Sequence, residues 1–212
     1  RLIGRIVKLG ILRIRQGTLS GQYRHPRGIQ FGGDSTQEST QVMRGLFQRA
    51  IDEYEQVVHL DMHTGYGPRY QMSMVNSTRE PASGPELTRR FNYPLITAAT
   101  PSDFYSVTGD ITEYFYQLRD EKYPSKKIFA TCFEFGTFGA GLPNQIRSMR
   151  ATILENRLFQ YGARSESLRS AVRKEYEELF FPAETKWRSK AIADCRQAFE
   201  GIFAAYGFLM EK

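Results

Sequence analysis

Residues 57–68 constrain the fold of this chain more than any other stretch, because they join an apolar run to a polar turn that is broken by glycines. Val57 and Val58 lead directly into the Asp-x-His pattern of Asp61 and His63. β-Branched residues in such a run are typical of a buried strand. Open α/β sheets keep their functional groups at the carboxyl ends of their strands. We therefore expect an α/β fold that places a carboxylate and an imidazole at one edge of its sheet.

Residues 128–137 repeat this design with a glutamate as the polar group. Glu134 stands alone near the end of an apolar run, and Gly136 follows two residues later. A carboxylate in an apolar strand must be paired, protonated or functional. It would either form a salt bridge with an arginine or act as a general base whose pKa is raised by burial and set by a nearby cation. The pattern leaves open whether Glu134 and His63 share one site.

Length and composition indicate a single domain. A chain of 212 residues is long enough for one full core and too short for two, so we expect residues 1–212 to form one unit. No apolar run reaches the roughly 18 residues that span a bilayer, and the basic start has no signal-like block, so no membrane partner is expected. The two cysteines lack a CxxC spacing, which fits a reducing compartment such as the cytoplasm. We interpret Cys132 as a small core residue.

The positive charge of the chain does not by itself predict a nucleic-acid partner. A net charge of +6 and a pI near 9.3 permit binding to an anionic surface. However, the basic residues are spread along the chain with no run longer than a pair, whereas nucleic-acid-binding proteins usually carry a clustered patch. If this chain did bind nucleic acid, its binding would depend strongly on salt and would require no metal.

The first part of the chain combines helical and loop patterns. Apolar residues at three- and four-residue steps predict a helix over residues 2–19, although three glycines weaken the pattern. Residues 21–33 are rich in glycine and predict an ordered loop or a short edge segment. A second helix is expected over residues 37–56, with N-cap candidates at residues 34–36. Its apolar side would consist of Val42, Leu46, Phe47, Ile51 and Tyr54.

The remaining pattern completes a mixed β-sheet flanked by helices. Residues 73–90 are polar and contain two prolines, which predicts a long surface loop. A short strand is expected over residues 93–99, and a helix capped by Thr108 or Asp110 runs to about residue 119. Three further helices would span residues 145–161, 165–180 and 183–206. These strands are too few for a sheet of the usual size, so the missing N-terminal strands would precede residue 1.

Only three histidines are available for a metal or acid–base site. His59, Asp61 and His63 alternate on one face of an ideal strand, but such neighbours point in parallel and converge poorly on one metal. His59 lies deep in the apolar run and is interpreted as a hydrogen-bonded core residue. His63 precedes a flexible turn, so it can reach into a cleft as a metal ligand or acid–base group, with Asp61 orienting it. Tyr105 precedes a helix, which leaves its phenol free to hydrogen-bond a ligand.

Together these residues resemble the C-terminal part of the zinc carboxypeptidase superfamily. There, the third zinc ligand is a histidine at a strand end, like His63 in Asp-Met-His-Thr-Gly. The catalytic glutamate lies in a later strand before a glycine-containing loop and a leucine-proline pair, like Glu134 ahead of residues 135–143. Residues 105–111 are similar to the tyrosine loop that closes over substrate in those enzymes.

Further motifs are similar to an uncharacterised bacterial branch of the superfamily. Phe31-Gly32-Gly33 with Glu38 resembles the segment before the strand that carries the zinc histidine. The other matching motifs are Gly21-Gln22-Tyr23 with Pro26, His63-Thr64-Gly65, Gly67-Pro68, and Phe180-Phe181-Pro182 with Trp187.

The resemblance implies zinc-dependent hydrolysis of a peptide or related amide bond in a peptide or acyl-amino-acid-like substrate. One zinc ion would polarise the scissile carbonyl and activate a water, while Glu134 takes the proton and passes it to the leaving amine. His63 would be a metal ligand, Asp61 would orient it from behind, and Tyr105 would bind substrate.

Two parts of the family pattern have no counterpart ahead of His63. These are the His-x-x-Glu motif, which supplies two zinc ligands, and the Asn-Arg pair, which binds the substrate carboxylate. Gly28 stands three residues after His25, and Met62 stands three residues after His59. A catalytic zinc needs three protein ligands and an open position. We therefore expect a missing N-terminal segment or another chain to complete the site. The alternative is a truncated or degenerate, non-catalytic binding protein on the same fold.

Overall fold

The computed structural model describes residues 21–99 and 109–208, and within them it contains four strands. The helix that the sequence predicts over residues 2–19 lies outside the described residues. The elements in chain order are α3 (Glu38–Glu53), β1 (Gln56–Arg69), β2 (Ser73–Asn76), α4 (Gly84–Phe91), β3 (Ile96–Ala98), α5 (Ile111–Lys122), β4 (Lys127–Gly136), α6 (Leu142–Tyr161), α7 (Glu166–Phe180) and α8 (Thr185–Ala205).

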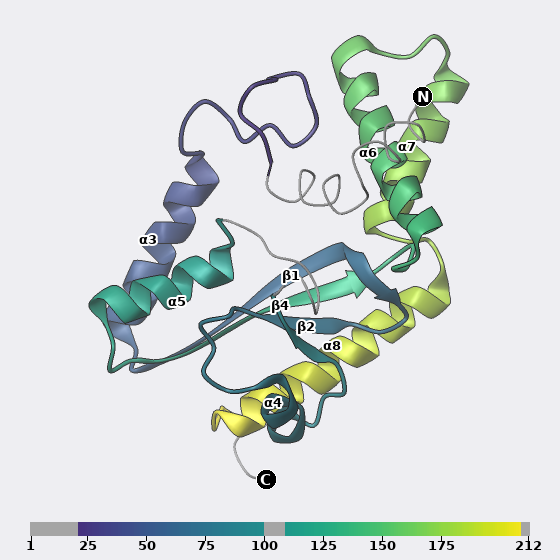
Figure 1. Ribbon diagram of the computed structural model, residues 1–212. Helices are drawn as coiled ribbons and strands as arrows, with labels where there is room; N and C mark the ends of the chain where they lie inside the picture. Colours follow the sequence, from purple (N-terminus) through teal and green to yellow (C-terminus); the bar gives the residue numbers. More distant parts are fainter. Residues whose placement is uncertain (1–20, 100–108, 209–212) are drawn as a thin grey trace.

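The strands form one mixed sheet in the order β1-β4-β2-β3. β1 is parallel to β4, β2 is antiparallel to β4, and β2 is parallel to β3. Helices α3 and α5 lie on one side of the sheet and α4 and α8 on the other, while the α6–α7 hairpin lies beyond the carboxyl ends of β1 and β4 (Figure 1). The expected mixed β-sheet flanked by helices is therefore confirmed.

Alternate residues of β4 build two cores on opposite faces of the sheet, as the two-residue period of a strand requires. Phe129 and Phe133 are fully buried and pack in one cluster with residues of α4 and α8. Ile128 and Ala130 face the other side and pack in a second cluster with residues of α3 and α5. Both faces of β4 are thus covered along most of the strand, which explains its nearly continuous apolar sequence.

The prediction that the chain turns directly after His63 is wrong, because β1 continues to Arg69. Gly65 and Arg69 both pair with Gly136, so the register shifts at this point. Gly65 and Gly67 have φ angles of 122° and 105°, which favour glycine. A Cβ atom on Gly136 would lie 2.3 Å from the carbonyl oxygen of Gly67. The glycines therefore let β1 bulge closely over the end of β4 instead of turning away.

The prediction of a long surface loop over residues 73–90 is also wrong, because this stretch contains a strand and a helix. Ser73–Asn76 form β2, a strand in the middle of the sheet whose four residues are all buried. Gly84–Phe91 form α4, which buries Leu87 and Phe91 in the core. Ser83 caps this helix by accepting a hydrogen bond from the Glu86 backbone N–H at 3.4 Å. One strand of the sheet and one helix that packs on the sheet thus come from a stretch that looks polar.

The other helices lie close to their predicted positions. In α3 only Phe47 and Ile51 are buried, whereas Val42, Leu46 and Tyr54 are exposed, so the predicted apolar side is only partly correct. The N-cap of α3 is Gln37, without a side-chain bond, rather than one of residues 34–36. The predicted cap at Asp110 is confirmed. Among the described residues, no helix has both the length and the apolar character needed to cross a membrane.

Candidate functional site

His63 and Glu134 lie opposite each other on the neighbouring parallel strands β1 and β4. Two residues earlier in each strand, Asp61 lies opposite Cys132. Residues two apart in a strand point to the same face. One face of the sheet therefore carries two successive pairs near the carboxyl ends of its strands. We call His63 and Glu134 the outer pair, and Asp61 and Cys132 the inner pair.

The outer pair and Cys132 form a compact group of potential metal ligands. One ligand atom each from His63, Cys132 and Glu134 lies within 4.8 Å of the other two. Glu134 and Cys132 are only 4% and 5% exposed, whereas the His63 side chain is 47% exposed. The group therefore extends from the core to the surface, with the imidazole on the accessible side.

Asp61 orients the His63 imidazole through a direct hydrogen bond. Nε2–H of His63 donates to Oδ2 of Asp61 at 2.7 Å. This bond is the main reason why the pKa of His63 lies above its ordinary value of 6.5. Burial raises the pKa of Asp61, but the bond from His63 and the imidazole charge outweigh it and leave that pKa below 3.8. With Nε2 engaged, Nδ1 is the His63 atom that can bind a metal.

Cys132 is buried as predicted, and it also belongs to the group of potential metal ligands, a role that the apolar run around it does not predict. Its sulfur atom lies within 4.8 Å of a ligand atom of His63 and of Glu134. Burial raises the pKa of this thiol strongly, and the negative charges of Glu134, Asp61 and Asp110 raise it further. The thiol is therefore protonated at neutral pH. The two-residue spacing from Glu134 was the available signal, because it places both side chains on one face.

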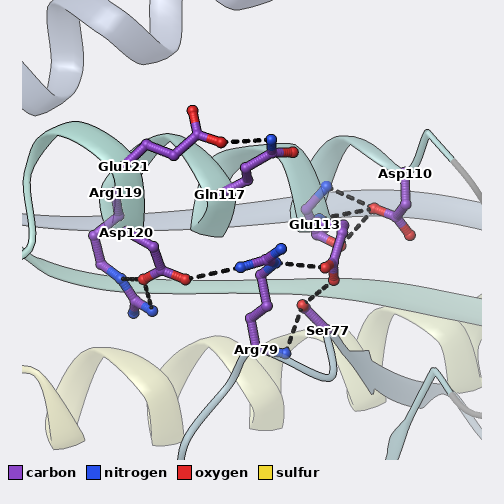
Figure 2. A network of polar contacts seen from close by, with 9 residues as sticks. Ser77, Arg79, Asp110, Glu113, Gln117, Arg119, Asp120 and Glu121 are labelled. Carbon is purple, nitrogen blue, oxygen red and sulfur yellow. Dashed lines mark hydrogen bonds and ion pairs between the residues drawn. The ribbon is translucent and has the colours of Figure 1, made fainter.

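Asp110 adds a further negative charge beside the site from the start of α5. Its Oδ1 accepts hydrogen bonds from the backbone N–H groups of Thr112 at 2.6 Å and Glu113 at 3.3 Å. Its charge contributes to the raised pKa of His63 and of Cys132. This start of α5 is stabilised by a network that joins it to the segment after β2 (Figure 2).

Arg79 is the centre of that network (Figure 2). Its side chain donates to Glu113 at 2.7 Å and to Asp120 at 3.2 Å, both on α5. Ser77, which directly follows β2, also hydrogen-bonds to Glu113. Since β2 pairs with β4, these contacts place the capping residue Asp110 relative to the strand that carries Glu134.

Ser73 brings a third strand to the site. It is the register partner of Glu134 on β2, so both side chains point to the same face. Ser73 is only 1% exposed, and its Oγ is buried without a hydrogen-bond partner among the described residues. Such an atom is uncommon in folded proteins. No local sequence pattern predicts this position of Ser73, because it depends on the pairing of β2 with β4.

Of the other two candidates, only His59 lies within the described residues. His59 packs its ring against Phe47 and Phe115, with centroids 4.9 and 5.8 Å apart, so its core position is confirmed. The predicted hydrogen bond is missing at Nε2, which is buried and has no partner in the described part of the chain. Burial lowers the pKa of His59. Tyr105, the predicted substrate-binding residue, lies outside the described residues.

The donor set is compatible with zinc at His63. Zinc accepts imidazole nitrogen, carboxylate oxygen and thiolate sulfur. An imidazole whose other nitrogen is bonded to a carboxylate, as in His63 and Asp61, is the usual arrangement of a metal-binding histidine. A ligand atom of Glu134 lies within 4.8 Å of this position, close enough for its carboxylate to act on a water bound to the same ion.

Comparisons with known proteins place the chain in a family without assigning its chemistry. Neither the curated proteins nor the solved structures gave a match, so the resemblance to zinc carboxypeptidases rests on the motifs quoted above. The family model DUF2817, described as a protein of unknown function, matches residues 1–194. Because this match covers most of the 212 residues, the chain belongs to the DUF2817 family.

Proposed function

We propose that this chain carries part of the active centre of a zinc-dependent hydrolase that cleaves peptide or related amide bonds. The observation that carries this proposal is the outer pair. His63 and Glu134 lie in register on adjacent parallel strands, and their ligand atoms are within 4.8 Å. A metal ligand and a general base need this kind of proximity if both are to act on one water molecule.

His63 is the metal-binding member of the pair in this proposal. Its Nε2 is held by Asp61 at 2.7 Å, so Nδ1 presents its lone pair to the ion. When bound there, zinc supplies a Lewis acid that polarises a carbonyl and lowers the pKa of a bound water. Asp61 keeps the imidazole in one tautomer and one orientation, and it increases the basicity of Nδ1.

Glu134 is the general base. Its carboxylate takes a proton from the attacking water and returns it to the leaving amine. The side chain is 4% exposed, which limits competition from bulk solvent for its oxygen atoms. We expect a peptide or an acyl-amino-acid-like molecule as substrate, with the Tyr105 phenol donating a hydrogen bond to it. The free cysteines Cys132 and Cys195 favour the cytoplasm as the compartment.

A non-catalytic binding protein on the same fold is the competing proposal. The observation that favours it is the lack of a His-x-x-Glu motif between Arg1 and His63. The two proposals differ in one feature of the gene. A His-x-x-Glu motif upstream of these residues supplies the two remaining zinc ligands and supports the hydrolase, whereas its absence supports the binding protein.

The hydrolase proposal is tested with Glu134→Gln in the complete gene product. We expect the variant to keep about one zinc ion per chain and to lose hydrolysis of a panel of acyl-amino acids and short peptides. Glu121→Gln, an exposed position on α5, is the matched control and should keep full activity. Retained turnover in Glu134→Gln would remove Glu134 from the role of base.

A further inference from the structure

We infer that Trp187 is a positioning residue for the outer pair: its indole N–H holds the carbonyl oxygen of Gly136 and thereby fixes the spacing of the pair across β1 and β4. The inference rests on the proposed function, because it names a residue that sets the geometry of the proposed site. Trp187 lies on α8 and packs on the face of the sheet opposite to the outer pair. It therefore acts through the backbone of β4 and touches neither metal nor substrate.

Gly136 is the point at which β4 outruns its neighbours. β2 starts at Ser73, opposite Glu134, so Gly136 extends two residues beyond it. On the other side of β4 the strand β1 bulges, and the register between the two strands shifts at Gly136. A buried backbone carbonyl group needs a hydrogen-bond partner. Trp187 supplies one, because its Nε1–H donates to the Gly136 oxygen at 2.7 Å.

The position of this bond links it to the outer pair. Gly65 and Gly136 pair with each other two residues beyond His63 and Glu134, so they form the next step on the same face of the sheet. A Cβ atom on Gly136 would lie 2.3 Å from the carbonyl oxygen of Gly67, so the two strands touch here through their backbones. A displacement of Gly136 therefore changes the separation of β1 and β4 directly beside the outer pair. Catalytic geometry tolerates little displacement of this kind.

The start of α8 holds the end of β1 as well. Glu184, the N-cap of α8, forms an ion pair with Arg69, the last residue of β1. The Tyr70 hydroxyl donates to the same carboxylate at 2.7 Å. This end of α8 lies beside the carboxyl ends of β1 and β4 (Figure 1). One turn of helix thus contacts both strands of the proposed site, and Trp187 is its contact with β4.

Tryptophan combines packing with a donor at this position. Trp187 is 5% exposed and packs in one cluster with Met72 and Phe135. Its ring would fill the core without the N–H group, but the Gly136 carbonyl group would then lose this partner. The bond is shielded from water, so solvent cannot easily replace it. The packing and the hydrogen bond can therefore be separated by an analogue that changes only the donor.

Amide hydrogen exchange in the 212-residue chain tests the contact itself. Trp187 is the only tryptophan of this sequence, so analogues fed to a tryptophan auxotroph replace it alone. Benzothienylalanine has sulfur in place of the indole N–H, whereas fluorotryptophan keeps the N–H and is the matched control. We expect the amides of residues 134–136 to exchange about ten-fold faster with benzothienylalanine than with fluorotryptophan, and those of residues 128–130 to be unchanged.

Two results of this experiment would overturn the inference. Equal exchange of residues 134–136 in the two forms would show that the N–H group does not hold the end of β4. Faster exchange along the whole of β4 would show a general loss of stability instead of a local effect.

A kinetic comparison separates positioning from packing. The same two analogues are introduced at position 187 alone in the complete gene product, and rates are normalised to the folded fraction measured by near-UV circular dichroism. We expect benzothienylalanine to lower kcat about ten-fold relative to fluorotryptophan, because the proposed base and metal ligand are held less exactly. KM and zinc content should stay unchanged. Equal kcat values in the two forms would overturn the positioning role.

The two proposals fail in different ways. Equal kcat values and equal exchange in the two forms would overturn the role of Trp187 and leave the proposed hydrolase in place. Retained hydrolysis in Glu134→Gln would instead contradict the proposed base, whatever the difference between the two analogues.

Discussion

At the scale of single residues, the Asp61–His63 pair is the best-defined contact of the site. The pKa of His63 is raised, so the pair adds stability below the ordinary imidazole value of 6.5, and this stability is lost as pH rises through the raised value. The pKa of Asp61 is lowered, so its contribution is present above 3.8 and is lost as pH falls through the lowered value. The pair therefore stabilises the fold most between pH 3.8 and 6.5.

Asp61→Asn tests this contact. We expect the pKa of His63 to fall in the variant, because the imidazolium loses both its hydrogen-bond acceptor and a neighbouring negative charge. The shift is measured by following the imidazole resonances of the zinc-free chain through a pH titration by NMR. Glu200→Gln, which removes an exposed carboxylate on α8, on the other side of the sheet, is the control. An unchanged pKa of His63 in Asp61→Asn would show that the contact is absent in solution.

At the scale of elements, long apolar runs were predictable and short polar ones were not. The strand around Glu134 and the three C-terminal helices follow from unbroken periodicity. β2 was missed because Ser73 and Asn76 are polar although both are buried. α4 was missed because its core-facing side consists mainly of Leu87 and Phe91.

Of the structural features that the sequence analysis did not predict, α4 has a recognisable sequence pattern, whereas the extension of β1 and the position of Ser73 have none. Ser83 with Glu86 three residues later, and Pro85 between them, is the pattern of a helix start and could have revealed α4. The extension of β1 beyond Gly65 had no local signal, because it depends on the close approach of Gly67 to Gly136 from a distant strand. The same holds for Ser73, whose place beside Glu134 is set by strand pairing.

The packing of α8 on α4 gives a prediction at this scale. A Cβ atom on Gly201 would lie 1.9 Å from the backbone oxygen of Phe91, so Gly201 allows the two helices to touch. We expect Gly201→Ala to destabilise the fold by about 1–3 kcal/mol, because the overlap outweighs the gain in helix propensity. Gly45→Ala, in α3 with open space around it, should instead stabilise by about 0.5–1 kcal/mol. Urea unfolding measures both, and equal stability of the two variants would contradict the close approach.

At the scale of the whole molecule, the sheet explains why distant segments meet at one site. β1 and β4 are about seventy positions apart in sequence, yet they pair in register and bring the outer and inner pairs together. β2 adds Ser73 from the other side of β4, and α5 adds Asp110. The sequence indicated the residues of the outer pair, but only the parallel pairing of the strands places them opposite each other.

The zinc affinity of the 212-residue chain depends on how many metal ligands its sheet brings together. With Glu134 as base and the Cys132 thiol protonated, His63 is the one ligand left in the group, whereas a stable catalytic site needs three. We therefore expect the chain expressed alone to retain far less than one zinc ion after dialysis at neutral pH, measured by atomic absorption. A longer gene product with an upstream His-x-x-Glu motif should retain about one, and should lose it in His63→Ala. Stoichiometric zinc on the short chain would mean that His63, Cys132 and Glu134 bind the ion together, and Glu134 would then be a ligand rather than the base.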